Sequence, residues 1–345
     1  MKHDCCDSKD QKLSASNVLK SKTSVIFIVC FILWGASSQI PALKHFAHSM
    51  QGYFSKIWWT VGLGLLIGGV IDQLVPKNII SYFLSGTRKR VILHAVGFGM
   101  LMSVCSHGVL AIAVQIHKKG ASTAAVVAFL LAAPWVNLPL ILLMFGLFGS
   151  KVFILVAGAV LTALWTGYIF QALESRGWIE PGLSDPENFS RDPGIIKEWM
   201  QSFRKFSLNR TNALPQIKSV LKSAFLLSDM IVLWVAVGIV AASATGAFIP
   251  HEYVGKYLGS DFAGLLRTLG IATVVEVCSE GTAPIAFELY QKTGALGNAF
   301  VFLMAGVVTD YTEIGLLWQN IGRKCAMMLP IVSVPPVILM AYLLN

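Results

Sequence analysis

Long apolar runs decide what this chain can fold into. Nine of them, each close to or above about 20 residues, are separated by polar stretches and cover residues 24–43, 53–76, 91–117, 121–148, 151–172, 217–249, 262–290, 294–319 and 325–343. A helix of about 20 apolar residues spans the hydrocarbon of a bilayer. Charged residues make up only 13% of the chain, too few to cover a water-facing surface. The sequence therefore predicts an all-α polytopic membrane protein with about 8–10 hydrophobic segments.

The composition excludes several other classes of protein. Hydrophobic residues make up 55% of the chain and the mean hydropathy is +0.67, which rules out a disordered chain and a basic nucleic-acid-binding domain. The net charge of +9 instead suits basic loops that remain in the cytoplasm. The six cysteines are scattered, and the first residues have neither the apolar core nor the cleavage site of a signal peptide. We therefore expect a reduced, cytoplasmic N-terminal tail.

The chain repeats itself after 173 residues. This shift places VCSHGVLAIAVQIHKKG (104–120) on VCSEGTAPIAFELYQKT (277–293), and 14 of the 48 positions between 104 and 151 are identical to their counterparts. Apolar composition alone gives only a few matches over such a length. The predicted organisation is a tail (1–22), a first transmembrane helix and loop (23–52), membrane repeat one (53–172), a cytoplasmic linker (173–216) and membrane repeat two (217–345).

The distribution of charge favours two segments that are re-entrant or broken. If all nine runs crossed the membrane, the basic linker would lie outside, against the positive-inside rule. If 91–117 and 262–290 instead turn back at CSHG and CSEG, 21 of the 27 Lys and Arg residues lie inside. Each half then has an odd number of crossings, and the halves form an inverted repeat, a common plan of secondary transporters. A tilted or kinked full span satisfies the same lengths, so both interpretations stay open.

Polar residues at membrane depth mark the candidate binding site. Two matching motifs hold a thiol, a hydroxyl, an ionisable group and a glycine: Cys105, Ser106, His107 and Gly108 in one half, and Cys278, Ser279, Glu280 and Gly281 in the other. Glycine permits a sharp turn and a close backbone approach. Helix ends that meet at such a turn present unpaired N–H and C=O groups to a cavity. We therefore predict that the solute binds there and that Cys105 and Cys278 lie close together.

The next segment of each half adds further polar residues. Pro134 and Pro139 bracket Asn137 and predict a break in that helix. A charge at the bilayer centre costs about 2.5–3.5 kcal/mol, so buried carboxylates need a reason such as water, protonation or a cation. We predict that Asn137, Thr309 and Asp310 join the binding site, and that the coupling protons are carried by Glu276, Glu280, Asp310 and Glu313.

Plainer interpretations stand beside these assignments. A buried cysteine usually acts as a small apolar residue. Cys105 and Cys278 are favoured as functional residues over Cys30 and Cys325 only because they recur within the same motif in both halves. Cys5 and Cys6, beside His3 and Asp4, offer ligands for a soft metal ion, but a flexible reduced tail is the favoured interpretation. Because the chain has no Walker, G-x-S-x-G or H-E-x-x-H motif, we expect neither an enzyme nor a cofactor, and the metal bound, if any, is unknown.

The two motifs resemble the signature of the predicted-permease family that includes the organoarsenical (methylarsenite) efflux permeases. The residues that carry the resemblance are VCSHGVLAIAVQIHKKGASTAAVVAFLLAAPWVNLP and VCSEGTAPIAFELYQKTGALGNAFVFLMAGVVTD, and the resemblance extends over about 53–345. It implies a multi-pass permease of the bacterial inner membrane that exports small solutes. The family pattern C-S-C-G has His107 in place of its second thiol here, which favours a mixed sulfur, nitrogen and oxygen ligand set over several thiolates.

These observations favour a secondary transporter that exports a small solute, such as an organoarsenical or another thiophilic metal or metalloid species. Two alternatives use the same residues: a channel whose re-entrant turns line a filter, and a membrane sensor or enzyme built on the Cys/His/Glu set. The expected partners are membrane lipid and a small-molecule or ion substrate, with no nucleic acid, and a homo-oligomer is compatible with the sequence. The N-terminus is expected in the cytoplasm.

The charge distribution makes a topological prediction. Single cysteines placed near Lys119 and within 180–200 should react with an impermeant thiol reagent from the cytoplasm, and one placed near Lys292 should react from outside, because the basic segments are retained inside. Reagent added to right-side-out and to inverted membrane vesicles measures this. Reaction of the positions near Lys119 and Lys292 from the same side would eliminate the inverted repeat.

Overall fold

The computed structural model describes residues 22–74, 83–84, 90–102, 106–118, 120–182, 213–275 and 278–345. The helices of the first part are α2 (Lys22–Gln39), α3 (Lys44–Leu74), α5 (Arg90–Met100), α6 (Ser106–Lys118), α7 (Thr123–Val136), α8 (Leu138–Phe148) and α9 (Val152–Ser175), with short 3-10 turns η1 (Pro41–Leu43) and η2 (Gly149–Lys151). Those of the second are α11 (Ala213–Phe248), α12 (His251–Tyr257), α13 (Phe262–Val275), α14 (Ser279–Thr293), α15 (Leu296–Val308), α16 (Tyr311–Asn320) and α17 (Arg323–Leu344).

Five stretches of these helices are long and apolar enough to cross a membrane, and the bent pair of α12 and α13 makes a sixth if it is counted as one span. The five are 44–71, 138–175, 217–248, 296–320 and 323–344. Shorter apolar helices accompany them, at 28–39, 90–100, 108–118 and 123–136. The prediction of an all-α polytopic membrane protein is confirmed.

The order of helices in the second part follows that of the first at the same spacing of 173 residues. Shifting α5, α6, α7, α8 and α9 by 173 places their first residues at 263, 279, 296, 311 and 325, within two residues of the first residues of α13 to α17. In the same way α3 falls on α11. One boundary differs from the sequence prediction, because α3 begins at Lys44 and not at 53. Its first turns, KHFAHSMQG, are more polar and continue the helix ahead of the apolar run that the prediction followed.

Both segments that carry the matching motifs are broken there. The run 91–117 divides into α5 and α6, of 11 and 13 residues, and the run 262–290 into α13 and α14, of 14 and 15 residues. At 1.5 Å per residue each piece is about 16–22 Å long, shorter than the roughly 30 Å of hydrocarbon in a bilayer. Helices that are broken at CSHG and CSEG, as the sequence predicts, are therefore part of the fold.

The helix that follows each of these broken segments is also interrupted. Asn137 ends α7 and begins α8 with an extended backbone (φ −70°, ψ 141°), which confirms the break predicted from Pro134 and Pro139. Asp310 occupies the equivalent place between α15 and α16, where the chain has no proline. Two glycines with positive φ make the turns before these helices, Gly120 (96°) and Gly294 (69°).

One end of the bundle, which we call the linker end, is tied together by two carboxylates. Glu174, at the end of α9, accepts hydrogen bonds from the N–H groups of Thr123 (3.2 Å) and Ala124 (3.2 Å) in the first turn of α7. Glu180 accepts hydrogen bonds from the N–H groups of Lys324 (3.1 Å) and Cys325 (3.0 Å) in the first turn of α17. These N–H groups have no partner within their own helices, so the two carboxylates act as caps.

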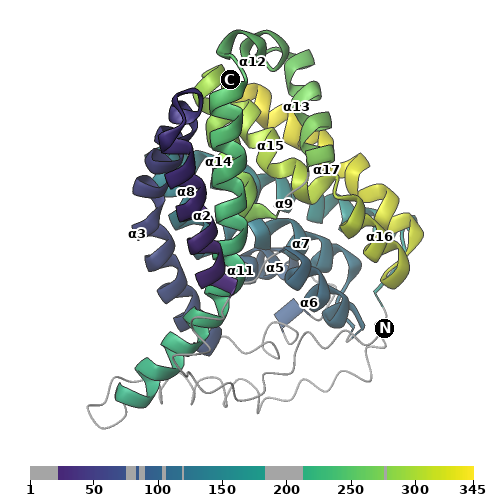
Figure 1. Ribbon diagram of the computed structural model, residues 1–345. Coiled ribbons are helices and arrows are strands. Elements are labelled where there is room, and N and C mark those ends of the chain that lie inside the picture. The colour runs from purple at the N-terminus through teal and green to yellow at the C-terminus, as the bar shows by residue number, and fades with distance from the viewer. Residues whose placement is uncertain are drawn as a thin grey trace.

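The opposite end, which we call the α12 end, is closed by different contacts. The N–H of Gly297, at the start of α15, donates to Oδ1 of the C-terminal Asn345 (2.7 Å). Asn298 donates to the carbonyl of Gly259 (2.9 Å), which follows α12. Figure 1 shows α12 and the C-terminus together at the top of the molecule. Thus α7 begins at the linker end and α15 at the α12 end, while α9 ends where α17 begins.

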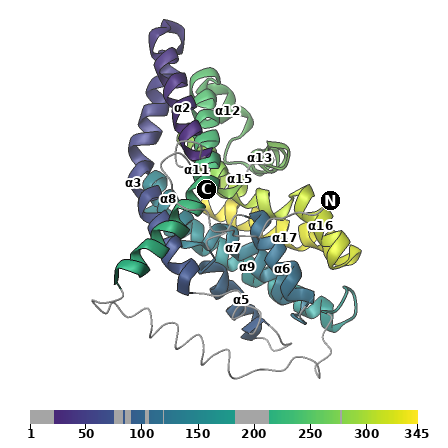
Figure 2. The same ribbon diagram turned by 60° about the horizontal axis from the view of Figure 1, so that its bottom comes forward.

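The helices α3 and α11 form one flank of the molecule and pack against each other along their length. Both views of the ribbon show α2 and α3 on this flank and α16 on the opposite one (Figures 1 and 2). The centre is formed by α7 and α15, which contact each other and are fully buried along almost their whole length. This buried centre holds the broken helices in position.

The cap that Glu180 provides predicts a dependence of stability on pH. Burial raises the pKa of this carboxyl, but the N–H groups of Lys324 and Cys325 and the ammonium of Lys324 outweigh burial, and the pKa is lowered from its ordinary value. A group with a lowered pKa stabilises the fold above its ordinary pKa and loses that contribution as pH falls through the folded-state value.

We therefore expect Glu180→Gln to lower the stability of the detergent-solubilised protein near neutral pH by about 1 kcal/mol. The difference from the unaltered protein should begin to shrink as the pH falls below the ordinary carboxyl pKa of about 4.3, and it should vanish only below the lowered folded-state pKa, where the native carboxylate is itself protonated. Thermal unfolding at the two pH values measures this. The control is Glu252→Gln, which removes the same charge from an exposed position of α12. Equal losses for both variants, or a difference that persists in acid, would show that Glu180 is not a cap.

Candidate functional site

Three side chains of the second motif converge at the start of α14. Cys278 is the N-cap residue of that helix, and its Sγ donates a hydrogen bond to Oε2 of Glu280 (2.8 Å). The hydroxyl of Ser279 donates to the same oxygen (3.2 Å). Glu280 is only 6% exposed and lies in the first turn, where the helix dipole favours a negative charge. A thiol, a hydroxyl and a carboxylate thus form one buried polar group.

Glu280 lies beside the broken helix of the other half. It lines a small cavity of about 10 Å³ together with residues of α3, α8 and α11: Val61, Gly64, Leu65, Pro139, Leu140, Leu143 and Ile231. This volume is close to the smallest that holds one water molecule. Pro139 and Leu140 belong to the first turn after Asn137, so the structure brings the CSEG motif of repeat two next to the Asn137 break of repeat one.

Close backbone contacts fix this arrangement. A Cβ atom on Gly238 of α11 would lie 2.3 Å from the carbonyl oxygen of Gly281, so only glycine allows α11 to approach the motif so closely. A Cβ atom on Gly64 of α3 would lie 3.1 Å from the carbonyl oxygen of Pro139. The close approach at the CSEG motif is therefore made possible by Gly238, and the predicted role of Gly281 itself stays a prediction.

The buried amide of Asn137 is used within its own break. Its Nδ2 donates to the carbonyls of Ala133 (3.1 Å) and Pro134 (3.2 Å), and its Oδ1 accepts from the N–H of Leu140 (2.8 Å). Asn137 thus satisfies groups that the break leaves free at both helix ends. The geometry gives it a capping role next to the Glu280 cavity.

Asp310 caps the following helix at the equivalent position. Its Oδ1 accepts from the N–H groups of Thr312 (2.5 Å) and Glu313 (3.0 Å) and from the hydroxyl of Thr312 (2.6 Å). Asp310 is 1% exposed. The neighbouring Thr309 shares a hydrogen bond of 2.7 Å with Thr273 near the end of α13. Asp310 therefore caps α16, and its predicted part in binding or proton transfer stays a prediction.

The structure brings some predicted site residues together and leaves others undescribed. Cys278, Ser279, Glu280 and Gly281 form one group, whereas Glu313 is buried in the first turn of α16. Gly108 is partly buried in α6. Cys105, Glu276 and the side chains of Ser106 and His107 lie outside what is described, so the predicted pairing of Cys105 with Cys278 stays a prediction. Within the described part of the chain, no three His, Cys, Asp or Glu side chains are grouped closely enough to hold a metal ion.

Sequence reasoning missed one buried charged group. Glu288 and Lys292 of α14 and Tyr53 of α3 lie together at the α12 end, and all three are at most 8% exposed. The available signal was the spacing of four between Glu288, inside the apolar run 262–290, and Lys292, just beyond that run. Their position near the end of that run made them look like ordinary helix-end residues.

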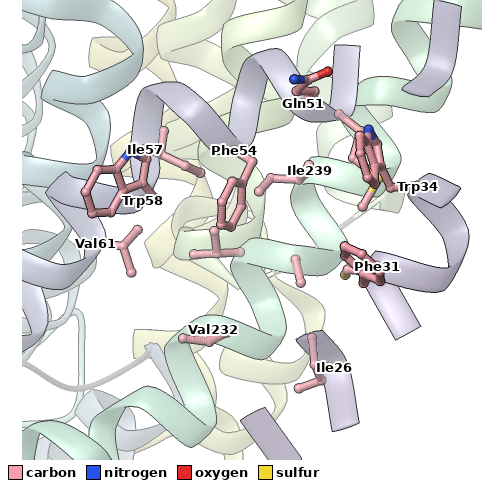
Figure 3. A pocket seen from close by; sticks show the side chains of 14 residues that line it. Ile26, Phe31, Trp34, Gln51, Phe54, Ile57, Trp58, Val61, Val232 and Ile239 are labelled. Carbon is pink, nitrogen blue, oxygen red and sulfur yellow. The ribbon is translucent and has the colours of Figure 1, made fainter. Parts of the chain in front are cut away.

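A larger cavity, of about 480 Å³, lies on the flank formed by α2, α3 and α11. Figure 3 shows its apolar lining, which includes Phe31, Phe54 and Trp58, with Gln51 as the polar side chain at its edge. It borders Val61, which also lines the small cavity at Glu280. Because its lining offers almost no hydrogen-bonding groups, it lacks the features of a site for a polar solute.

Comparison with known proteins adds to this description. A family model described as "Predicted permease" matches residues 35–345. UPF0718 protein YcgR of Bacillus subtilis is 23% identical over 272 residues, which cover 77% of this chain and 85% of the relative. UPF0718 protein MJ0584 of Methanocaldococcus jannaschii is 24% identical over 318 residues, with 77% and 85% covered. A Streptococcus mutans protein named "Putative two-component membrane permease complex subunit" is 21% identical over 285 residues, with 82% and 88% covered. No solved structure matches the chain.

The capping geometry of Asp310 leads to a prediction about stability. Asp310→Asn should leave the unfolding temperature of the detergent-solubilised protein nearly unchanged, because Asn is as good an N-cap residue as Asp, whereas Asp310→Ala should cost about 1 kcal/mol. Asn137→Asp and Asn137→Ala form the matched pair in repeat one. If Asn and Ala at 310 destabilise the protein equally, the charge and not the cap holds α16.

Proposed function

This chain belongs to the predicted permease family, and we propose that it is a secondary transporter that exports a small thiophilic solute across the bacterial inner membrane. The observation that carries the proposal is the convergence of Cys278, Ser279 and the carboxylate of Glu280 at a broken helix in the buried centre of the bundle. Membership of the family makes the protein a membrane permease. We propose the class of solute, the direction of transport and the energy source that drives it.

The chemistry of the Cys278 group suits a soft cation or metalloid. A thiolate is a strong ligand for soft ions, but a neutral thiol is not. Because the Sγ of Cys278 donates its hydrogen to Glu280, the carboxylate is placed to take up that proton when a solute binds sulfur. Binding of a soft cation would form one bond from sulfur to the cation, break the S–H bond and move that proton to Oε2. Binding of methylarsenite would form a sulfur–arsenic bond and also break an arsenic–oxygen bond, and the hydroxide would leave as water with the proton taken up from sulfur. Release of the solute reverses these steps and restores the thiol.

We further infer that the two halves form an inverted repeat with re-entrant hairpins. The opposite starting ends of α7 and α15 support this, as do the opposite directions of α9 and α17. The hairpin of α13 and α14 has both outer ends near the α12 end, since Gly259 precedes α13 and Ala295 follows α14. A binding site at the meeting point of two inverted halves is common in secondary transporters.

The orientation follows from charge. Lys118, Arg176, Arg323 and Lys324 lie at the linker end, where the basic linker is attached. The rule that basic loops remain inside then assigns the linker end to the cytoplasm and the α12 end to the outside. The N-terminus is cytoplasmic in the same scheme.

The experiment that tests the proposal is uptake of methylarsenite by inverted membrane vesicles energised with a proton gradient. We expect Cys278→Ser and Glu280→Gln to reduce uptake at least about 100-fold, because the first removes the soft ligand and the second the proton acceptor. Asp310→Asn keeps the cap and removes the charge, and we expect it to abolish uptake as well, in line with its predicted coupling role.

The matched control is Cys325→Ser, which alters another buried cysteine in α17 away from the site and should leave uptake unchanged. Each variant is compared at equal amounts in the membrane. Full uptake by Cys278→Ser and Glu280→Gln would refute the proposed site. An ohmic current through the purified protein in planar bilayers would show a channel instead.

A further inference from the structure

The cavity of about 480 Å³ between α2, α3 and α11 takes no part in the proposed function, and we refer to it as the flank groove. Three aromatic side chains in its wall are more than half exposed: Phe31 (70%), Phe54 (51%) and Trp58 (62%). Figure 3 shows them around the same space, on α2 and α3. Because α3 and α11 are long and apolar enough to span the membrane, these rings face the bilayer, and material from the bilayer must cover them.

The flank groove has the length of one leaflet of a bilayer. Its lining extends from Met50 to Val61 on α3, and from Ile26 to Trp34 on α2. At 1.5 Å per residue these stretches are about 16 and 12 Å long, and half of the hydrocarbon of a bilayer is roughly 15 Å thick. The acyl chain of a phospholipid extends over the same depth.

The flank groove is too small for a transmembrane helix. A helix with its side chains is about 10 Å across, so a 12 Å length of it fills roughly 900 Å³. This is about twice the volume of the groove. An acyl chain is much thinner, and its CH₂ groups need no hydrogen-bond partner. It therefore suits both the volume and the apolar lining.

The end of the flank groove at the α12 end is cationic. Tyr53 contacts Glu288 at the α12 end, so α3 begins there with the exposed Lys44. Gln51 follows Lys44 by seven residues, which places both on nearly the same side of the helix. Since Gln51 is at the edge of the groove, Lys44 lies in line with that edge, about 10 Å farther toward the helix start. No acidic residue occurs between 22 and 71, so this end of the groove attracts a phosphate group.

We propose that the flank groove binds a phospholipid with an acidic headgroup, taken from the leaflet at the α12 end. An acyl chain of this lipid lies between α2 and the flank formed by α3 and α11, and its phosphate lies near Lys44. Val61 lines both the groove and the small cavity at Glu280. The bound chain therefore covers Val61 on the membrane side and becomes part of the wall that separates Glu280 from the bilayer.

The experiment locates the lipid by photochemical labelling of the full-length protein in detergent. The probe is phosphatidylglycerol with a photoreactive diazirine in one acyl chain, added in equal molar amount, and peptide mass spectrometry identifies the labelled residues. We expect label on the groove-lining parts of 26–34, 50–61 and 232–239. Bulk hydrocarbon is as apolar as the groove, so selectivity depends on the headgroup. Unlabelled phosphatidylglycerol should compete about fivefold better than phosphatidylcholine with the same chains, the ratio expected from one lysine at a membrane surface.

Two pairs of variants separate the headgroup from the chain. Lys44→Gln should keep the label in the groove and remove the preference for the acidic lipid, whereas Lys256→Gln, at an exposed position of α12, should keep that preference. Ala236→Phe adds a ring inside the groove and should lower labelling at least about tenfold. Val237→Phe adds the same ring at the next position, which is exposed and does not line the groove, and should leave labelling unchanged.

Three results would overturn the proposal. Equal labelling of exposed residues elsewhere, such as Phe153 and Trp165 of α9, would show only the lipid that surrounds any membrane protein. Equal competition by the two lipids would refute the acidic headgroup. An unlabelled groove would refute the lipid itself, and linkage of Cys30 in two copies by a bis-maleimide would then identify a second copy of this chain as the occupant. The experiment uses neither solute nor proton gradient, so its result is independent of methylarsenite uptake.

Discussion

Every break in a helix at membrane depth leaves backbone N–H and C=O groups without partners, and this fold depends on how the chain supplies them. Asn137 and Asp310 satisfy the breaks that separate α7 from α8 and α15 from α16. Glu174 and Glu180 satisfy the helix starts at the linker end from elsewhere in the chain. Because side chains at fixed positions supply these hydrogen-bond partners, the broken helices can hold polar groups in the centre of the bundle. The Cys278 and Glu280 group uses one such helix start.

The membrane class, the repeat and several breaks follow from local features of the sequence. The apolar runs predict the spanning helices, and paired prolines around Asn137 predict the break there. The break at Asp310 has no proline, and only the repeat points to it. Its cause is the carboxylate itself, which bonds the first N–H groups of α16 and so competes with a continuous helix.

The contacts that tie distant segments together could not be read from the sequence. Glu180 belongs to the segment that the sequence predicts to be a linker. It caps α17 only because that helix begins beside it. Glu288 looks like a helix-end residue until Tyr53, 235 positions away, is found against it. In both cases the sequence shows a charged residue, and its meaning depends on a neighbour that only the packing supplies. The approach of Gly238 to Gly281 is of the same kind, since a lone glycine does not reveal what lies against it.

The cap that Glu180 places on α17 also bears on where this chain could be divided. A chain cut at the end of α9 would leave Glu180 on the same fragment as α17, so this cap would not join the two fragments. A cut within 183–212 would leave Glu180 with repeat one. The two fragments would then be joined by the hydrogen bonds from the N–H groups of Lys324 and Cys325 to the Glu180 carboxylate. Division of the gene at this later point is therefore the arrangement that would let two separate polypeptides assemble into the same bundle.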